Sequence, residues 1–236
     1  MVCSGKTQAV IIVSPTGLPF FLLAASPLRC PMDEGGVSPE KRLAAAGFQP
    51  QNVEADDSIV FMLDPDLRIV YCNAAWDLFA SQNNGVGLLR SAISGTAILD
   101  AIPEPLKSFY ARRFAQVATT GSPWEHDYEC SSPDRYRLFH MRVLPLSESH
   151  LLVENSLRFE EPHGPDRPSM TADPSLYFNK HGILTRCSHC RRTRRVGASG
   201  HQWDWVPEYV AKPPGAVSHG LCLNCRAFFY PEIRSR

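Results

Sequence analysis

Two pairs of closely spaced cysteines in the last third of the chain are the residues best suited to a chemical role. Each pair has the spacing C-x-x-C, and 31 residues separate the two pairs; the cysteines are Cys187, Cys190, Cys222 and Cys225. Four thiolates in this pattern can bind one tetrahedral Zn²⁺ ion at about 2.3 Å from each sulfur. A redox-active C-x-x-C pair instead begins a helix in a βαβ unit, and neither pair here has such surroundings. The spacing therefore favours a structural zinc site over a redox site.

The first cysteine pair lies in the arginine-rich stretch RCSHCRRTRR, residues 186–195. Four arginines follow this pair: Arg191, Arg192, Arg194 and Arg195. One Zn²⁺ ion with four thiolate ligands carries a charge of about −2, which the arginines can offset. The same arginines can also contact the phosphates of a nucleic acid. We expect the nearby His189 and His219 to lie beside the metal ligands or at the surface, without binding the metal.

A zinc ion with four cysteine ligands has no open coordination position for a substrate or a water molecule. The sequence also lacks an H-x-E motif with a nearby P-C-x-x-C motif, the pattern that zinc deaminases use. Kinase motifs and phosphate-binding loops are absent from it as well. We therefore predict no catalytic residues and no enzymatic activity.

Acidic and basic residues are unevenly distributed in this chain, whose formal net charge is zero. Residues 51–160 contain 15 Asp and Glu against 9 Lys and Arg, a net charge of −6. Residues 176–236 contain 10 Lys and Arg against 3 Asp and Glu, a net charge of +7. The sequence between them is polar and rich in proline. We therefore predict two modules, at 51–159 and 176–236, joined by a linker at 160–175; their opposite charges can attract each other.

Residues 1–50 are expected to form a disordered tail or to include a wrongly assigned start, because Met32 begins ordinary soluble sequence and can replace Met1 as the first residue. A membrane span needs about 20 unbroken apolar residues, whereas the apolar segment 9–26 is interrupted by two prolines and a glycine. Paired cysteine spacing favours a reducing compartment over a disulfide framework. We therefore expect a cytoplasmic protein that does not contact a membrane.

Hydrophobic periodicity in residues 51–159 predicts a domain of mixed helices and strands. Two strands joined by the turn residues 64–66 are expected first, and Asn73 then suits the N-cap of a short helix. A longer helix follows because apolar residues recur at helical spacing, and strict alternation after it indicates strands. The predicted strands lie at 58–63, 67–72, 124–130, 136–146 and 150–157, and the long helix lies at 105–120.

The segment IVFMLDPDLRIVYCNAAWDLFA, residues 59–80, resembles the opening hairpin and first helix of a PAS domain. The resemblance implies an α+β fold, in which a five-stranded antiparallel sheet cups helices around a small cavity that senses a ligand or docks a partner. The ligand of this cavity stays unknown. The segment lacks the cysteine motif of flavin photoreceptors, since Cys72 precedes the helix, and the helix at 105–120 has no histidine that could bind haem iron.

Residues 187–232 resemble a C-terminal element of bacterial sensory proteins that follows PAS, GAF or receiver modules. The residues that match its second half are Ser218, His219, Gly220, Tyr230, Pro231 and Glu232. A module of fewer than about 70 residues generally needs a disulfide or a metal ion for stability. In this zinc-ribbon-like segment, zinc would fill that role. The aromatic residues expected to form a small core around the metal are Trp203, Trp205, Tyr209, Phe228, Phe229 and Tyr230.

The remaining titratable residues of the middle module are expected to have structural roles. His126 and His140 each stand alone on a predicted strand, where a histidine is more often structural than a ligand. Three acidic residues of the strand at 124–130 share one face, which is expected to be solvated. Cys130 is expected to be a small buried residue.

These features predict a cytoplasmic bacterial signalling protein, a sensor or adaptor, whose PAS domain senses a small ligand or docks a partner and is coupled to a structural zinc module. The expected partner is another signalling protein or a second copy of the chain, bound through the PAS domain. The alternative is a nucleic-acid-binding transcriptional regulator that uses the basic zinc module.

Overall fold

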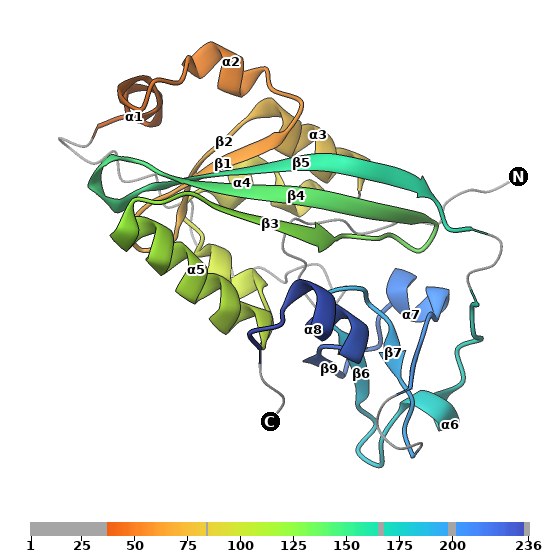
Figure 1. The fold of residues 1–236 in the computed structure, drawn as a ribbon. Coiled ribbons are helices and arrows are strands. Elements are labelled where there is room, and N and C mark those ends of the chain that lie inside the picture. Colours follow the sequence, from red (N-terminus) through yellow and green to blue (C-terminus); the bar gives the residue numbers. More distant parts are fainter. Residues whose placement is uncertain (1–36, 84, 165–167, 198–201, 234–236) are drawn as a thin grey trace, which may run out of the picture.

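The computed structural model of the chain describes residues 37–83, 85–164, 168–197 and 202–233. Two parts follow each other: a sheet domain, residues 39–162, and a four-cysteine module, residues 174–233 (Figure 1). Each part has its own β-sheet, so the α+β class expected from the sequence is confirmed. Residues 1–36 of the expected tail lie outside the described residues. Within the described ranges, no helix is both long enough and apolar enough to cross a membrane.

The sheet domain is built on five antiparallel strands in the order β2-β1-β5-β4-β3, as the resemblance implied. They are β1 (Ile59–Leu63), β2 (Ile69–Cys72), β3 (Trp124–Glu129), β4 (Arg135–Pro145) and β5 (Leu151–Pro162). β5 is longer than predicted and runs into the range expected to be a linker. There Glu160 forms ion pairs with Arg135 (2.9 Å) and Arg137 (2.6 Å) of β4. The end of β5 is thus held to β4 by cross-strand ion pairs. The prediction missed this end because it relied on the alternation of apolar residues.

Helices cover one face of this sheet. They are α3 (Ala74–Gln82), η1 (Val86–Leu88), α4 (Arg90–Ile93), η2 (Ile98–Ala101) and α5 (Leu106–Thr120), while η3 (Ser147–Ser149) lies in the turn between β4 and β5. α5 faces the sheet with the apolar side that its periodicity predicted, and Phe109, Phe114 and Val117 are at most 1% exposed. Gly121 ends α5 at a φ of 65°, a left-handed conformation that glycine adopts without strain.

Two further helices, α1 (Pro39–Ala45) and α2 (Pro50–Glu54), cover part of the opposite face of the sheet (Figure 1). Leu43 of α1 is fully buried there, in a cluster with Val60 and Met62 of β1. Residues 39–50 fall in the range expected to be a tail. The structure places them in the folded domain, because their apolar side chains cover this face.

Asn73 fixes the junction between the first hairpin and α3. Its side chain is fully buried, and its Oδ1 atom accepts hydrogen bonds from the backbone amides of Val60 (3.0 Å) and Trp76 (3.3 Å). Its Nδ2 atom donates to the carbonyls of Val53 (3.1 Å) and Ser58 (2.9 Å). The predicted N-cap is therefore confirmed, and the same side chain also ties α2 and β1 to α3.

The outer edge of β2 is covered by the loop that precedes η2. The Ile69 amide donates to the Thr96 carbonyl (3.0 Å), and the Gly95 amide donates to the Ile69 carbonyl (2.7 Å). Gly95 has a φ of 78°, which favours glycine at this turn. The loop therefore satisfies backbone groups that an edge strand would otherwise expose.

The four-cysteine module contains a four-stranded sheet in the order β8-β7-β6-β9. Its elements are α6 (Pro174–Tyr177), β6 (Leu184–Cys187), β7 (Thr193–Arg194), β8 (Trp203–Asp204), α7 (Pro207–Ala211), β9 (Val217–Gly220) and α8 (Leu223–Phe229). β6 and β9 are parallel, with Cys187 opposite Gly220, so both C-x-x-C pairs lie at the same end of the sheet. α8 lies between this sheet and the end of β3 (Figure 1).

Replacing Asn73 by Ala is expected to lower the free energy of unfolding by about 3 kcal/mol, because it removes buried hydrogen bonds and leaves backbone groups unsatisfied. Equilibrium unfolding in urea measures this loss. The matched control, Asn52→Ala, removes an exposed side chain of α2 and should change the free energy by less than about 0.5 kcal/mol. Equal effects of the two substitutions would contradict the role assigned to Asn73.

Candidate functional site

The four cysteines of the two C-x-x-C pairs lie together. Cys187 is the last residue of β6, and Cys190 follows in the next turn. Cys222 is the N-cap of α8, and Cys225 lies in the first turn of that helix. Their sulfur atoms all lie within 4.8 Å of one another, and all four side chains are buried. The structure thus brings together the residues that the spacing singled out.

The sulfur geometry suits a metal ion rather than a disulfide. The Cys190 and Cys222 sulfurs are 3.7 Å apart, whereas a disulfide bond measures about 2.05 Å. Two sulfurs bound to the same tetrahedral zinc ion at about 2.3 Å are about 3.8 Å apart. Backbone amides also donate to the cluster, from Cys222 to the Cys187 sulfur (3.4 Å) and from Cys225 to the Cys222 sulfur (3.5 Å). The cluster can therefore hold a metal ion.

The four thiols influence one another's ionisation. Hydrogen bonds from Cys187 and Cys190 lower the pKa of the Cys222 thiol far below its ordinary value. Hydrogen bonding to Cys187 raises the pKa of the Cys190 thiol, and burial raises it further. The pKa values of Cys187 and Cys222 are thus lowered and those of Cys190 and Cys225 raised, so the cluster favours two thiolates and opposes the other two. A cation among the sulfurs would remove this opposition, because a coordinated thiol loses its proton.

His189, between the first two cysteines, joins the module to the sheet domain. Its side chain is buried, and its Nε2 atom accepts a hydrogen bond from the backbone amide of Glu129 in β3 (3.0 Å). A neutral imidazole that accepts at Nε2 carries its proton on Nδ1. The Nδ1 atom therefore donates to the Tyr230 hydroxyl, at 2.9 Å. Burial lowers the pKa of His189 to about 3, so the ring is neutral near pH 7.

Tyr230, directly after α8, lies inside the core of the sheet domain. Its side chain is 1% exposed. Its ring centroid is 5.0 Å from that of Phe109 in α5 and 5.1 Å from that of His126 in β3. Tyr110 of α5 belongs to the same cluster of buried side chains. A side chain of the C-terminal module thus completes the core of the domain before it.

The expected aromatic core around the metal is wrong for several of its members. Trp203 and Phe229 pack against the cysteines as expected. Tyr209 belongs to a separate cluster, Tyr230 lies in the sheet domain, and Phe228 is 80% exposed. Consecutive residues of a helix point about 100° apart, so aromatic residues at 228, 229 and 230 cannot all face one metal site.

The arginines of the basic stretch do not form one surface. Arg191 is 6% exposed, and its Nη2 atom lies 3.9 Å from the sulfur of Cys130, just beyond β3. Arg195 forms an ion pair with Asp204 at 2.5 Å. Arg194 is exposed. The stretch is therefore divided between the interior, an ion pair and the surface.

The two histidines of the sheet domain lie in different surroundings. His140 is on the outer face of β4, with its Nδ1 atom 2.6 Å from the Asp127 carboxylate, and both Asp127 and Glu125 are exposed. His126 instead points toward α5 and Tyr230. Its buried Nε2 atom has no hydrogen-bond partner among the described residues. Burial lowers the pKa of His126 to about 4.

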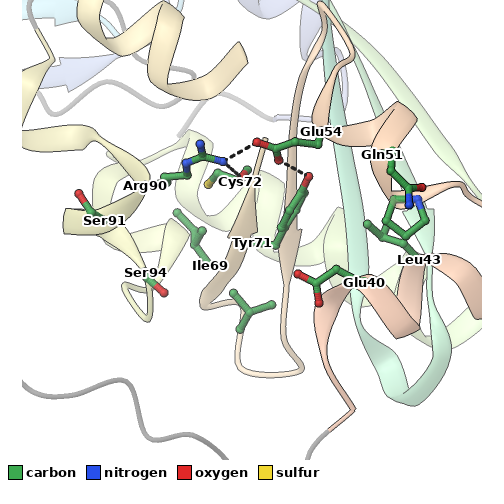
Figure 2. Close-up of a pocket in the computed structure, with 12 residues that line it drawn as sticks. Glu40, Leu43, Gln51, Glu54, Ile69, Tyr71, Cys72, Arg90, Ser91 and Ser94 are labelled. Carbon is green, nitrogen blue, oxygen red and sulfur yellow. Dashed lines mark hydrogen bonds and ion pairs between the residues drawn. The ribbon is translucent and has the colours of Figure 1, made fainter. Parts of the chain in front are cut away.

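A cleft of about 750 Å³ beside β2 was not anticipated from the sequence. Figure 2 shows Arg90 of α4 paired with Glu54 of α2 at 2.8 Å, and the Tyr71 hydroxyl of β2 donating to the same carboxylate at 2.9 Å. Arg90 also pairs with Asp77 at 2.8 Å. These residues are distant in the chain, so no local motif could mark the cleft.

Residues 53–154 match the family model described as the PAS fold. These residues form a PAS domain. Solved structures similar to it include the PAS domain of the Cronobacter turicensis RpfR quorum-sensing receptor in complex with C12:0. It is 19% identical and covers 44% of this chain and 96% of that chain, with a TM-score of 0.35.

Two other solved structures are similar to this chain. The PAS domain of Bordetella pertussis BvgS is 16% identical and covers 45% of this chain and 81% of that chain, with a TM-score of 0.35. A sensory box sensor histidine kinase from Vibrio cholerae is 16% identical and covers 51% of this chain and 94% of that chain, with a TM-score of 0.34. No curated protein matches the chain significantly. These similarities concern the PAS fold alone.

The low pKa of His126 predicts a loss of stability in acid. Its pKa is about 4 in the folded protein against 6.5 for an ordinary histidine, so the unfolded chain binds the proton first. The stabilisation is complete above about pH 6.5 and is lost as the pH falls toward about 4. Urea unfolding at about pH 7 and pH 5 should show the wild type losing about 2 kcal/mol more than His126→Phe. Parallel losses in the two proteins would contradict the prediction.

Proposed function

We propose that the chain is a signalling sensor or adaptor, in which the PAS domain binds a small molecule or a protein partner and the four-cysteine module relays this binding. The position of Tyr230 carries the proposal, because a side chain of the module forms part of the PAS core. A change in that core has a direct physical route to the module through packed and hydrogen-bonded groups.

The route consists of few side chains. Phe109 and Tyr110 of α5 contact Tyr230, and Tyr230 accepts a hydrogen bond from His189. His189 directly precedes Cys190 in the chain. A movement of α5 on ligand binding would shift Tyr230, and the hydrogen bond would pass this shift to the segment that holds the metal ligands.

We propose Zn²⁺ as the metal, in a structural role. Cys187, Cys190, Cys222 and Cys225 would hold it, and four thiolates suit its tetrahedral coordination. The strands of the module are only two to four residues long, so their hydrogen bonds alone hold the module weakly. Bound zinc would supply folding free energy to such a small unit.

The remaining parts of the proposal concern activity, place and partners. We propose no enzymatic activity, because a zinc site with four cysteine ligands is closed to substrate. Cys72 and Cys130 are buried and form no disulfide within the described part of the chain, which suits the cytoplasm, where thiols stay reduced. The partner would be another signalling protein or a second copy of the chain, bound through the PAS domain.

A nucleic-acid-binding regulator is the alternative, and the net charge of +7 over residues 176–236 favours it. The positions of the arginines favour it less, since Arg191 is buried against Cys130 and Arg195 is paired with Asp204. Phosphate contacts would therefore depend on the other basic side chains of the module, such as the exposed Arg194.

The salt dependence of DNA binding separates these two functions. Each phosphate contact contributes about −0.9 to the slope of log K against log salt. With few arginines free, mixed-sequence duplex DNA should bind weakly in fluorescence anisotropy titrations, with a slope no steeper than about −2. A slope of about −4 or steeper, with tight binding at low salt, would support the regulator instead.

Zinc removal tests the sensor proposal. Native mass spectrometry of the full chain should find one zinc ion per chain, and Cys225→Ser should lose it. The zinc-free variant should show faster hydrogen exchange in β3 and α5, because His189 and Tyr230 no longer hold them. β1 and β2, on the other side of the sheet, serve as an internal reference.

Cys72→Ala is the matched control, since it removes a buried thiol of the PAS domain and should keep the zinc ion. A folded wild type without metal, or a Cys225→Ser variant that retains zinc, would refute the zinc site. Loss of zinc with unchanged exchange in β3 and α5 would refute the relay while leaving the metal site in place.

A further inference from the structure

The site occupied by Tyr230 has the shape and polarity of a binding site for a phenol. We call it the Tyr230 seat; the residues around it are Phe109, Tyr110, His126 and His189. The Phe109 ring meets the Tyr230 ring edge to face, at 88°, and the His126 ring is tilted by 48° against it. Such arrangements are favourable between aromatic rings. The walls of the seat thus recognise an aromatic ring.

The inner end of the seat recognises a hydroxyl. The His189 Nδ1 atom donates to the Tyr230 oxygen at 2.9 Å, and the buried ring of Tyr110 lies in the same cluster. The tautomer of His189 is fixed from outside the seat, because its Nε2 atom accepts from the Glu129 amide. A ring without a hydroxyl would leave this buried Nδ1 donor unsatisfied, which is unfavourable. The seat therefore distinguishes a phenol from a plain aromatic ring.

One polar atom at the seat is not used by Tyr230. The Nε2 atom of His126 is buried and has no hydrogen-bond partner among the described residues. A ligand can displace Tyr230 only if it binds the seat more favourably. A free phenol with a second polar group would also form a hydrogen bond with His126. It would therefore bind the seat more favourably than the Tyr230 side chain does.

The chain segment that carries Tyr230 is held to the PAS domain by few other contacts. Glu232 forms an ion pair with Arg113 of α5, in which both side chains are about one third exposed. Phe229 and Ile233 pack against the core only in part. Exposed ion pairs contribute little stability. Tyr230 is thus the one residue of 226–233 that is fully buried in this core, so displacing its side chain would remove the largest contact of the segment.

We propose that the Tyr230 seat is a binding site for a small phenol, that Tyr230 occupies it in the ligand-free chain, and that the phenol displaces Tyr230. This inference rests on the proposed relay, since displacement would break the hydrogen bond from Tyr230 to His189. The cleft beside β2 is a weaker candidate for such a ligand. There Arg90 is already paired with Glu54 and Asp77.

The binding test uses the full chain with its zinc and the Tyr230→Ala variant. The probe is 4-methylphenol, which has the structure of the tyrosine side chain, and toluene is the same shape without the hydroxyl. Calorimetric titration should show 4-methylphenol binding to Tyr230→Ala at least about fivefold more tightly than toluene, a difference of about 1 kcal/mol. Phe228→Ala, which removes the exposed aromatic neighbour, should bind neither compound.

Equal affinity for the two compounds would overturn the phenol site, because the seat would then be only an apolar cavity. Absence of binding to a folded Tyr230→Ala would overturn it as well. Should Tyr230→Ala not fold, Tyr230→Phe takes its place. It keeps the ring but lacks the hydroxyl, so 4-methylphenol should displace its side chain at a lower concentration than in the wild type, and equal concentrations would overturn the proposal.

Displacement is measured in the wild type by hydrogen exchange. The probe here is 4-methylcatechol, a phenol whose second hydroxyl can bond to His126; at saturation it should raise the exchange rate of residues 226–233 several-fold while β3 and β4 stay protected. Continued protection of residues 226–233 would overturn displacement, and so would equal loss of protection in β4. Faster exchange at 226–233 without any change in β6 and β9 would support the site but refute the relay. If zinc removal speeds exchange in β3 and α5 but the phenol changes no exchange rate, the relay would be supported and the phenol site overturned.

Discussion

The hydrogen bond from the Glu129 amide to His189 determines how the two parts of this protein fit together. It occupies Nε2, so the imidazole proton lies on Nδ1 and points at the Tyr230 hydroxyl. The same ring stacks on Phe229 at 4.1 Å between centroids, beside the four cysteines. One small side chain therefore aligns a strand of the PAS domain, the helix α8 and the metal centre at once. Without the His189 ring, the buried hydroxyl of Tyr230 would lose this hydrogen-bond donor.

Most of the PAS domain was predictable because its signals are local. Alternation in residues 124–130 and helical spacing in residues 105–120 each indicated one element with its buried face, and the structure confirms both. The last strand was predicted too short, because its end pairs with β4 through Glu160 and looks like linker sequence. Helix α2 was missed, since its five residues bury only Val53. Short elements of this kind are stabilised by the fold around them rather than by their own pattern.

The candidate site likewise has a part that local sequence predicts and a part that depends on distant contacts. The spacing of the two C-x-x-C pairs predicted that the four cysteines lie together, and the structure confirms it. The roles of His189 and Tyr230 depend on contacts across 60 and 41 residues of chain, which no local pattern encodes. Tyr230 looked like part of the metal module because it adjoins Phe229. In the structure Phe229 packs against both the cysteines and the PAS core, whereas Tyr230 is buried within the PAS core.

The chain itself closes both edges of the PAS sheet at defined points. At β2 the loop at 95–96 bonds to Ile69, and at β3 the amide of Glu129 is taken by His189. An open edge invites a neighbouring molecule to extend the sheet by strand addition. Here that mode of association is disfavoured at Ile69 and Glu129. At these two points, two copies would have to meet through sheet faces or helices, where side-chain complementarity, rather than main-chain bonding, selects the partner.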